Sequence, residues 1–211
     1  MIRVGTSGWN YPHWRGTFYP RDLSSDRWLD YYCRHFDTVE LNKTFYNLPD
    51  SEQFASWSAQ VSENFRFAVK ASRYITHMKK LKAPTQSCAR LTEQVRALGS
   101  TLGPLLFQLP PNWKQNPDRL DTFISALPSD MDYAFEFRAP SWMNDHIYEI
   151  LARNNVAFCI YELSGYQAPL WVTSTISYVR LHGPGAAYEG SYDDCTLSQW
   201  AQWAKTRERD G

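Results

Sequence analysis

The stretch Tyr133–Arg138, which reads YAFEFR, decides the fold class of this 211-residue chain. In an extended strand, side chains alternate between two faces. Ala134, Glu136 and Arg138 therefore share one face, and the two phenylalanines share the other. The same alternation recurs at VELN (39–42), FAVK (67–70) and VRLH (179–182). Each of these strands thus has one apolar face and one face that ends in polar or charged side chains.

Seven short runs of β-branched and aromatic residues predict strands. They are Ile2–Thr6, Thr38–Lys43, Arg66–Lys70, Pro104–Leu109, Tyr133–Arg138, Val156–Tyr161 and Ser177–His182. Between them, apolar residues recur at helical spacing, and the sequence predicts helix starts at Asn116-Pro117 and at the Thr196/Gln199 pair. Repeated strand–helix alternation predicts right-handed β-α-β units and a parallel sheet.

Two architectures satisfy this pattern: a doubly wound open sheet and a closed barrel. Central strands of a doubly wound sheet are covered by helices on both faces and are apolar throughout. In a barrel, the inner face can become polar at the carboxyl-terminal mouth. The strands here therefore favour an α/β fold of the TIM-like (β/α) barrel type. Seven strands are visible, so we expect residues 1–211 to form a single barrel domain whose eighth βα unit is missing at the C-terminus.

Composition narrows the class of protein and its surroundings. Apolar residues make up 43% of the chain, which excludes a disordered or collagen-like protein. Lys plus Arg equals Asp plus Glu at 22 each, so the net charge does not favour nucleic acid or anionic lipid. No apolar run is long enough to span a membrane, and no secretory leader precedes the first strand. Four widely spaced cysteines fit a reducing compartment, so we expect a cytoplasmic protein.

Polar and aromatic residues gather where the predicted strands end, which in TIM barrels is the working face. The candidate catalytic residues are Glu136, Glu40, Lys70 and His182, and the candidate ligand-binding residues are Arg138, Arg180, Gln108, Asn42, Trp9, Tyr46 and Trp142. Glu40 and Glu136 could act as an acid–base pair if their carboxyl groups lie roughly 5–9 Å apart. Lys70 could form a Schiff base. Arg138, Arg180 and His182 could hold a phosphate or carboxylate.

Five ordered motifs resemble a known family. They are GTSGWNYPHWRG (5–16), VELNKTFY (39–46), LFQLPP (106–111), AFEFRAPSW (134–142) and YVRLHG (178–183). This set resembles the DUF72, or YecE-like, family from the first residues to the last. The resemblance implies a TIM-like barrel of uncharacterised function. It also implies that family members continue into a further aromatic strand carrying an asparagine/aspartate pair, which this sequence lacks.

Fold similarity between that family and endonuclease IV-like barrels suggests a nucleic-acid hypothesis. Such barrels use a zinc cluster, which requires several converging His and carboxylate ligands. Of the five histidines, only His182 sits at a strand end, so the sequence predicts no metal site and no cofactor.

Three functional hypotheses remain open. The leading one is an enzyme or binding protein for an anionic or sugar-containing small molecule at the barrel mouth. If it is an enzyme, it could be a hydrolase or a lyase, and the sequence does not assign a reaction. The second is a nucleic-acid-binding protein, in which the basic segment Arg73–Lys82 works beside the aromatic mouth. The third is a protein without catalysis, in which Glu40, Glu136, Lys70, Arg138 and Arg180 form an internal salt-bridge network.

Overall fold

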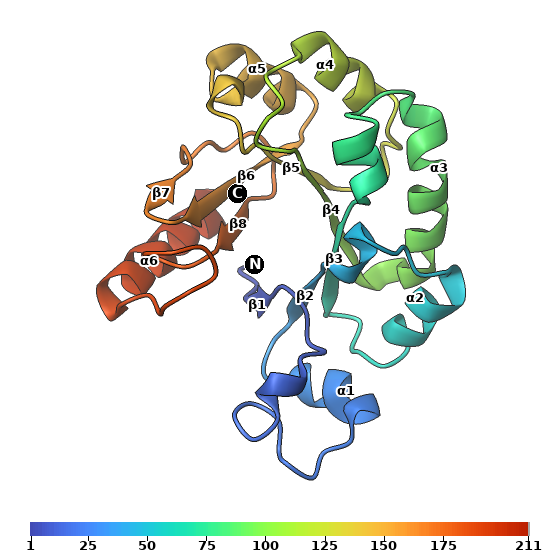
Figure 1. Cartoon of the computed structure of the whole chain (residues 1–211), viewed down its shortest axis with the longest axis vertical. Coiled ribbons are helices and arrows are strands. Elements are labelled where there is room, and N and C mark those ends of the chain that lie inside the picture. Colours follow the sequence, from blue (N-terminus) through green and yellow to red (C-terminus); the bar gives the residue numbers. More distant parts are fainter. Residues whose placement is uncertain (211) are drawn as a thin grey trace. The chain divides into compact units, whose positions relative to one another are not determined.

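The computed structural model describes residues 1–210, shown in Figure 1. Contacts within the chain divide it into two compact units. The first unit contains residues 3–105 and 126–132. The second unit contains residues 1–2, 106–125 and the chain from 133 onward. Because strand β4 (Leu102–Gln108) crosses the boundary at residue 105, each unit has its own share of the sheet.

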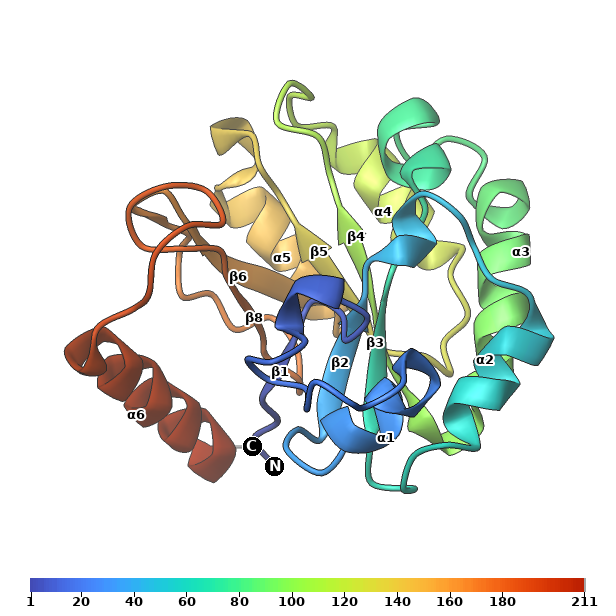
Figure 2. The ribbon, with the colours of Figure 1, turned by 60° about the horizontal axis from the view of Figure 1, so that its bottom comes forward.

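The first unit carries β1 (Gly5–Thr6), β2 (Thr38–Leu41) and β3 (Arg66–Lys70), followed by the start of β4. Its strands are parallel, and Glu40 on β2 lies opposite Ala68 on β3. The helices of this unit are α1 (Trp28–Tyr32), α2 (Ser51–Ser58) and α3 (Pro84–Val95). Figures 1 and 2 show α2 and α3 beside β3. This is the β/α alternation that the sequence predicts.

The second unit continues from the end of β4 through β5 (Tyr133–Glu136), β6 (Ala157–Leu163) and β8 (Tyr178–Leu181). These strands are also parallel, with Ala134 opposite Ala157 and Tyr161 opposite Arg180. Its helices are α4 (Pro117–Ser125), α5 (Asp145–Arg153) and α6 (Asp194–Asp210). The residues described thus contain seven parallel strands, one at each position predicted from the sequence.

One strand was missed by the sequence reasoning. Strand β7 (Tyr166–Gln167) is antiparallel to β6 and pairs Leu163 with Tyr166. The two residues of the turn, Ser164 and Gly165, both have positive φ, at 51° and 77°. Such a backbone matches the twist of a two-residue hairpin, and a Ser-Gly pair is a known turn signal.

The two faces of the sheet in the second unit bury different side chains. One face carries phenylalanines that contact the helices, such as Phe107 and Phe135, which both lie against Phe123 of α4. The opposite face begins with a cluster of small or aliphatic residues: Leu106, Ala134, Ala157 and Cys159, with Ile176 and Tyr178 packed against it. The alternation within YAFEFR therefore separates a helix-covered face from a face of small side chains.

Side-chain caps begin several helices where the sequence supplies an Asp or Asn. Asn116 Oδ1 accepts from the backbone of Arg119, so the predicted start at Asn116-Pro117 is confirmed. The predicted start at Thr196 is wrong. Helix α6 begins at Asp194, because the carboxylate of Asp193 accepts the backbone N–H of Thr196 and caps the helix three residues before the expected cap, Thr196.

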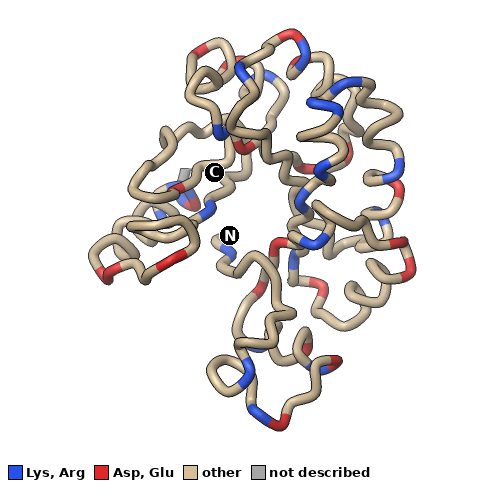
Figure 3. Tube along the Cα trace, in the orientation of Figure 1, with Lys and Arg blue, Asp and Glu red and all other residues tan. Residues whose placement is uncertain are grey.

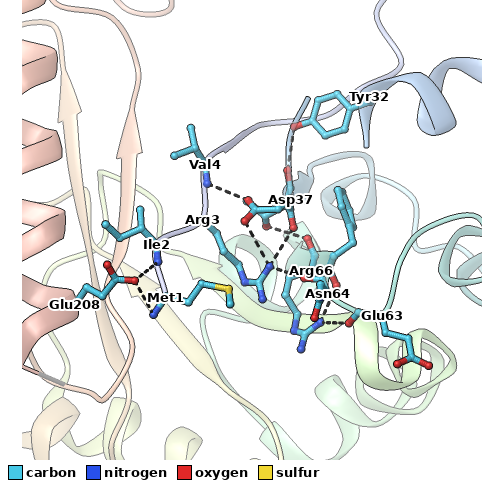
Figure 4. Close-up of polar contacts among 12 residues, drawn as sticks. Met1, Ile2, Arg3, Val4, Tyr32, Asp37, Glu63, Asn64, Arg66 and Glu208 are labelled. Atoms are coloured by element: carbon cyan, nitrogen blue, oxygen red, sulfur yellow. Dashed lines mark hydrogen bonds and ion pairs between the residues drawn. The ribbon is translucent and has the colours of Figure 1, made fainter. Parts of the chain in front are cut away.

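The predicted strand Ile2–Thr6 is shorter in the structure, where β1 is Gly5–Thr6. Figure 4 shows the reason in the first unit: the backbone N–H of Val4 donates to Asp37 Oδ1 at 3.2 Å instead of to a strand. The guanidinium of Arg3 donates to the carbonyl of Asn64. Side chains therefore take over the hydrogen bonds of the first residues.

The amino terminus is also held within the second unit. Figure 4 shows the Met1 amino group 3.3 Å from Glu208 Oε1, and the backbone N–H of Ile2 donates to the same oxygen at 3.1 Å. Both sides of this ion pair are exposed, so it contributes little to stability. Among residues 1–210, no helix is long and apolar enough to cross a membrane.

Candidate functional site

A single buried carboxylate organises the polar end of the sheet in the second unit. Glu136 is the last residue of β5 and is completely buried. Its Oε1 accepts from Nε of Arg138 and, at 2.6 Å, from Nε2 of Gln108. Its Oε2 accepts from Nη1 of Arg180 at 2.5 Å, and the thiol of Cys159 lies 3.8 Å from it. Both oxygens are therefore engaged by donors from four different positions.

The two arginines that hold this carboxylate are themselves withdrawn from water. The Arg138 side chain is 10% exposed, and that of Arg180 is 7% exposed. The guanidinium of Arg138 also lies over the ring of Tyr161, 4.4 Å from its centroid. Buried charges are costly unless they are paired, and both guanidiniums pair with the same carboxylate.

One nitrogen of the Arg138 guanidinium makes no hydrogen bond within the described residues. Its Nη2 is buried and has no hydrogen-bond partner among residues 1–210. An unsatisfied buried donor costs about 1–3 kcal/mol, and more when the group is charged. Each such group in a native structure calls for an explanation. A bound anion is one such explanation, because its oxygens accept hydrogen bonds from a guanidinium.

The environment of Glu136 fixes its charge state. Burial alone would raise the pKa of this carboxyl group, because desolvation disfavours the ionised form. The positive charges of Arg180 and Arg138, with hydrogen bonds from Gln108 and Arg180, outweigh burial and lower the pKa to about 2. Glu136 is therefore a carboxylate at neutral pH and has no proton to donate.

The polar groups form a layer above an apolar one. Gln108 and Glu136 end their strands, and each stands two residues beyond a member of the small-residue cluster, Leu106 or Ala134. On β6, Tyr161 likewise follows Cys159 by two positions, and it pairs in register with Arg180. Side chains two apart share a face. The chain therefore places its polar groups together at the carboxyl ends of four parallel strands.

His182 and Trp142, also in this unit, behave differently from each other. His182 directly follows β8, is 6% exposed, and its ring lies edge-on to that of Tyr188, 5.3 Å away. Trp142 is fully buried; it stacks on Phe137 and donates from Nε1 to the carbonyl of Trp113. The structure thus keeps His182 at the polar end and uses Trp142 for packing.

The remaining predicted site residues lie in the first unit. Asn42 donates from Nδ2 to the carbonyl of Ser7 at 3.0 Å, and so helps fix the loop after β1. Glu40 is 8% exposed, and its charge, after burial, raises the pKa of Tyr11. Lys70, the last residue of β3, holds its ammonium group 4.6 Å from the ring centroid of Phe45.

Trp9 is partly buried, whereas Tyr46 is exposed. Trp9 packs edge-on against Trp57 and Phe67, whereas Tyr46 is 80% exposed. Nearby in this unit, the His77 ring lies 5.1 Å from that of Phe45. Burial, followed by the charges of Lys70 and Arg73, lowers the pKa of His77. Polar groups thus collect at the strand ends of this unit as well, where Asn42 contacts backbone and Lys70 contacts an aromatic ring.

Two members of the Glu136 cluster were not among the predicted site residues. Tyr161 supports the Arg138 guanidinium, and Cys159 contacts the carboxylate. The sequence contained a signal for both residues: Cys159 and Tyr161 lie two positions apart on one strand and therefore share a face, as Glu136 and Arg138 do in YAFEFR. Burial, with the neighbouring Tyr166, raises the pKa of Tyr161 to about 12, so its hydroxyl remains protonated at neutral pH. Among residues 1–210, no group of three or more His, Cys, Asp or Glu could hold a metal ion.

Parallel β/α units with polar side chains gathered at their carboxyl ends define this chain as an α/β protein of the TIM-like barrel class, with seven parallel strands among the residues described. A family model described as "Protein of unknown function DUF72" matches residues 3–210. The chain belongs to this family.

Solved structures support the same assignment. A DUF72 family protein from Thermotoga maritima superposes with a TM-score of 0.86 and 27% sequence identity, covering 99% of this chain and 88% of that one. A DUF72 family protein from Enterococcus faecalis gives a TM-score of 0.69 at 21% identity, covering 98% of this chain and 86% of that one. The second likeness shows the fold alone.

Two curated relatives carry family names without an activity. The UPF0759 protein YecE of Escherichia coli is 30% identical over 145 residues, which is 67% of this chain and 50% of the relative. The UPF0759 protein YunF of Bacillus subtilis is 29% identical over 159 residues, 71% of this chain and 55% of the relative. The matched region thus spans about half the length of these relatives.

Proposed function

We propose that this protein binds an anionic small molecule at the carboxyl ends of β4, β5, β6 and β8, with Arg138 as the main contact. The observation that carries the proposal is the buried Nη2 of Arg138, which has no hydrogen-bond partner among residues 1–210. Guanidinium groups are well suited to carboxylates and phosphates because their donors form a planar fork. An anion at this position supplies the missing acceptor.

Glu136 serves this function as a positioning residue. Its carboxylate holds Arg138 and Arg180 in fixed orientations, so little conformational entropy is lost when a ligand binds. Tyr161 supports the guanidinium plane from one side. The preorganised cluster therefore favours binding even though it is costly to bury.

Because Glu136 is ionised, it does not fit the role of a general acid. A general acid must carry a proton at the working pH, and the pKa of about 2 leaves this group ionised. His182, buried after β8 at the same end, is the predicted catalytic residue of this unit that could exchange a proton with a bound ligand. Glu40 and Lys70, in the first unit, retain their acid–base and Schiff-base roles as predictions.

Thermal shift and calorimetric titration with small carboxylates and phosphate esters test this proposal. We expect anions, but not their neutral amide or alcohol analogues, to raise the melting temperature. Arg138→Gln removes the charged fork, and we expect it to weaken binding by about tenfold or more, because hydrogen bonds to charged groups contribute about 1.5–3 kcal/mol.

Arg153→Gln is the matched control. Arg153 is an exposed arginine of α5 paired with Asp121 at 2.6 Å, so its loss removes a guanidinium outside the cluster. We expect this variant to bind as the wild type does. The proposal fails if no anion shifts the melting temperature at millimolar concentration, or if a folded Arg138→Gln protein binds with unchanged affinity.

A second candidate function rests on the first unit. Residues 64–92 contain seven Lys or Arg and no Asp or Glu, and the basic positions are blue in Figure 3. Within this stretch, the Lys79 ammonium lies 5.4 Å from the ring centroid of Tyr74, and Tyr74 and Met78 are exposed. A basic surface with exposed aromatic rings is typical of proteins that bind single-stranded nucleic acid.

Fluorescence anisotropy with labelled single- and double-stranded DNA and RNA separates this candidate from the first. Binding through phosphates weakens steeply as salt increases. Lys79→Gln combined with Lys82→Gln should reduce such binding and leave small anions unaffected. Absent or salt-insensitive binding excludes the nucleic-acid candidate.

A further inference from the structure

We propose that the first unit contains a binding site for a neutral, hydroxylated ring, of the pyranose sugar type, at the carboxyl ends of β2 and β3. In this site, Nε2 of His77 accepts a hydrogen bond from a hydroxyl group of the ligand, and the exposed ring of Tyr46 lies against the face of the sugar. The site uses none of the residues assigned to anion binding, so the two functions are tested separately.

The ring of Phe45 brings the groups of this site together. Phe45 lies in the short turn that follows β2, and its ring centroid is 5.0 Å from that of Tyr46 and 5.1 Å from that of His77. In the same turn, Thr44 donates to the carbonyl of Lys70 at 2.7 Å, which ties the turn to the end of β3. Two segments that are distant in the sequence thus place Tyr46 and His77 next to one buried ring.

The segment that carries His77 has an unusual backbone. Residues Tyr74–Met78 form a π-helix. Shortly after it, Lys80, Leu81 and Ala83 all have positive φ, at 49°, 63° and 48°. Positive φ is strained for residues other than glycine, and both this strain and π-helices occur frequently at functional sites. The backbone around His77 therefore favours a functional role for the segment.

The hydrogen bonds of Thr76 indicate which nitrogen of His77 carries the ring proton. The Thr76 hydroxyl has a single hydrogen, which it donates to the carbonyl of Ser72 at 3.3 Å, and its oxygen also lies 2.9 Å from Nδ1 of His77. Both hydrogen bonds form together only when Nδ1 carries the proton and donates to Thr76. Because Thr76 is fully buried, Nδ1 serves the interior of the unit, and Nε2 of the partly exposed ring is left as an acceptor for a ligand.

The surroundings of His77 keep this acceptor in its neutral form. Burial, followed by the positive charges of Lys70 and Arg73, lowers the pKa of His77 from its ordinary value of 6.5. The imidazole is therefore mostly uncharged at pH 7 and above. The lone pair of a neutral imidazole repels the oxygens of a phosphate or carboxylate, whereas it accepts a hydrogen bond from a hydroxyl group. An anion bound beside Lys70 would instead raise the pKa of His77, which gives the two ligand classes different signatures.

Tyr46, which the sequence predicts as a ligand-binding residue, supplies the apolar surface that a sugar needs. Its side chain is exposed, although the neighbouring Phe45 is buried. The face of an aromatic ring carries negative charge density, so the slightly positive C–H groups of a pyranose lie favourably over it. Sites for small molecules combine such rings with a few polar groups that fix orientation. Tyr46 and His77 provide one of each.

NMR and calorimetric titrations at pH 8, where free imidazole carries little charge, test the site with matched probes. The probes are the methyl pyranosides of glucose, galactose and mannose, together with tetrahydropyran, which has the same ring without hydroxyl groups. Proton–nitrogen correlation spectra of the His77 ring should show a proton on Nδ1 and none on Nε2. We expect at least one pyranoside to shift the Nε2 resonance at millimolar concentration, and tetrahydropyran to bind about tenfold more weakly or less.

Variants assign the binding to the two side chains. His77→Phe keeps a ring against Phe45 and removes the acceptor, so it should weaken pyranoside binding by about tenfold. His35→Phe is the matched control, because His35 is an exposed histidine of the first unit that also contacts aromatic rings, and it should bind as the wild type does. Tyr46→Ala should also weaken binding, whereas Tyr46→Phe retains the ring and should retain most of the affinity. Since Tyr46 is exposed, its variants decide the matter even if His77→Phe does not fold.

Four results would overturn the site. The first is a proton on Nε2 of His77 in place of Nδ1, and the second is the absence of any change in the His77 resonances with all three pyranosides. The third is unchanged pyranoside binding in Tyr46→Ala. The fourth is protonation of both ring nitrogens on addition of inorganic phosphate, which would show that these strand ends bind an anion. None of these results bears on Arg138, so anion binding in the second unit stands or fails by its own test.

Discussion

The carboxyl ends of the strands carry polar side chains in both units, but the two groups are held together differently. In the second unit, Glu136 is bound by side chains alone: two guanidiniums, an amide and a thiol. In the first unit, Asn42 and Thr44 donate to backbone carbonyls, and the Lys70 ammonium lies over an aromatic ring. The contacts of Glu136 form an ionic network, whereas those of Asn42 and Thr44 hold the loops that follow the strands.

This difference separates a candidate binding site from a framework. Hydrogen bonds from side chains to backbone stabilise a loop without burying net charge. A buried ion-pair network is costly to desolvate, and hydrophobic residues of similar volume often stabilise a core as well or better. We therefore interpret the Glu136 network as the proposed anion-binding site, and the contacts of Asn42 and Thr44 as part of the framework.

The largest effect is expected from Glu136→Gln. The substitution keeps the shape of the side chain but removes the carboxylate that two buried guanidiniums share, and losing one partner of a buried ion pair costs about 3–5 kcal/mol. The free energy of unfolding, measured by urea denaturation at pH 7, should fall by this amount.

Asp130→Asn is the matched control, because Asp130 also pairs with an arginine in two hydrogen bonds, at 2.6 and 3.1 Å from Arg96. Both side chains of that pair are more than half exposed. Exposed ion pairs contribute about 0–1 kcal/mol, so the effect should be small. Similar losses in the two variants would contradict the distinction drawn between a buried network and a surface pair.

The pH dependence of stability gives the next largest effect. The folded-state pKa of Glu136, about 2, lies below its ordinary value of 4.5. The carboxylate thus stabilises the folded state above about pH 4.5, and this stabilisation is lost as pH falls through 2. A shift of this size corresponds to about 3 kcal/mol. The stability difference between the wild type and Glu136→Gln should shrink by that amount between pH 5 and pH 2, and a difference independent of pH would contradict the lowered pKa.

Much of the fold was predictable because strand and helix patterns are local. The run RFAVK gives β3 at its predicted bounds, Arg66–Lys70. The misses occur where another group competes for the backbone. Asp37 takes the N–H of Val4 and shortens β1, and Asp193 caps α6 ahead of the predicted start. These contacts depend on side chains that local periodicity does not describe.

The candidate site was predictable as a set of positions but not as a network. Alternation in YAFEFR places Glu136 and Arg138 on one face, but which atoms they share depends on the register of β5, β6 and β8. The register also brings Cys159 and Tyr161 into the cluster. For Trp142, the position in the sequence does not decide the role of the side chain. An aromatic residue after a strand can stack on a ligand or on the protein core, and Trp142 stacks on Phe137 in the core.

A smaller loss of stability is expected when a hydrogen bond between the strand ends of the first unit is removed. Thr44 is fully buried and donates to the carbonyls of Leu41 and Lys70, at 2.6 and 2.7 Å, linking the ends of β2 and β3. Thr44→Val keeps the shape and removes the donor, which should lower the free energy of unfolding by about 1–3 kcal/mol. Thr206→Val, at an exposed threonine of α6, should change it by less than about 0.5 kcal/mol.

Anion binding by Thr44→Val tests whether the first unit contributes to the proposed site. Because Thr44 belongs to the framework of the first unit, a folded Thr44→Val protein should bind anions with the affinity of the wild type. A selective loss of anion binding in this variant, with little loss of stability, would mean that the first unit takes part in the site.

The smallest expected effect is a change in the titration of His77. Burial lowers the pKa of His77, and the positive charges of Lys70 and Arg73 lower it further by disfavouring the imidazolium form. Lys70→Met removes one of these charges and keeps an apolar stem against Phe45, so the pKa should rise, yet remain below its ordinary value because burial persists. NMR titration of the His77 ring protons measures this shift, with Lys82→Met, at an exposed lysine, as the control. An unchanged pKa in Lys70→Met would show that the ammonium of Lys70 does not act on this ring, and that the strand ends of the first unit are less closely coupled than their contacts indicate.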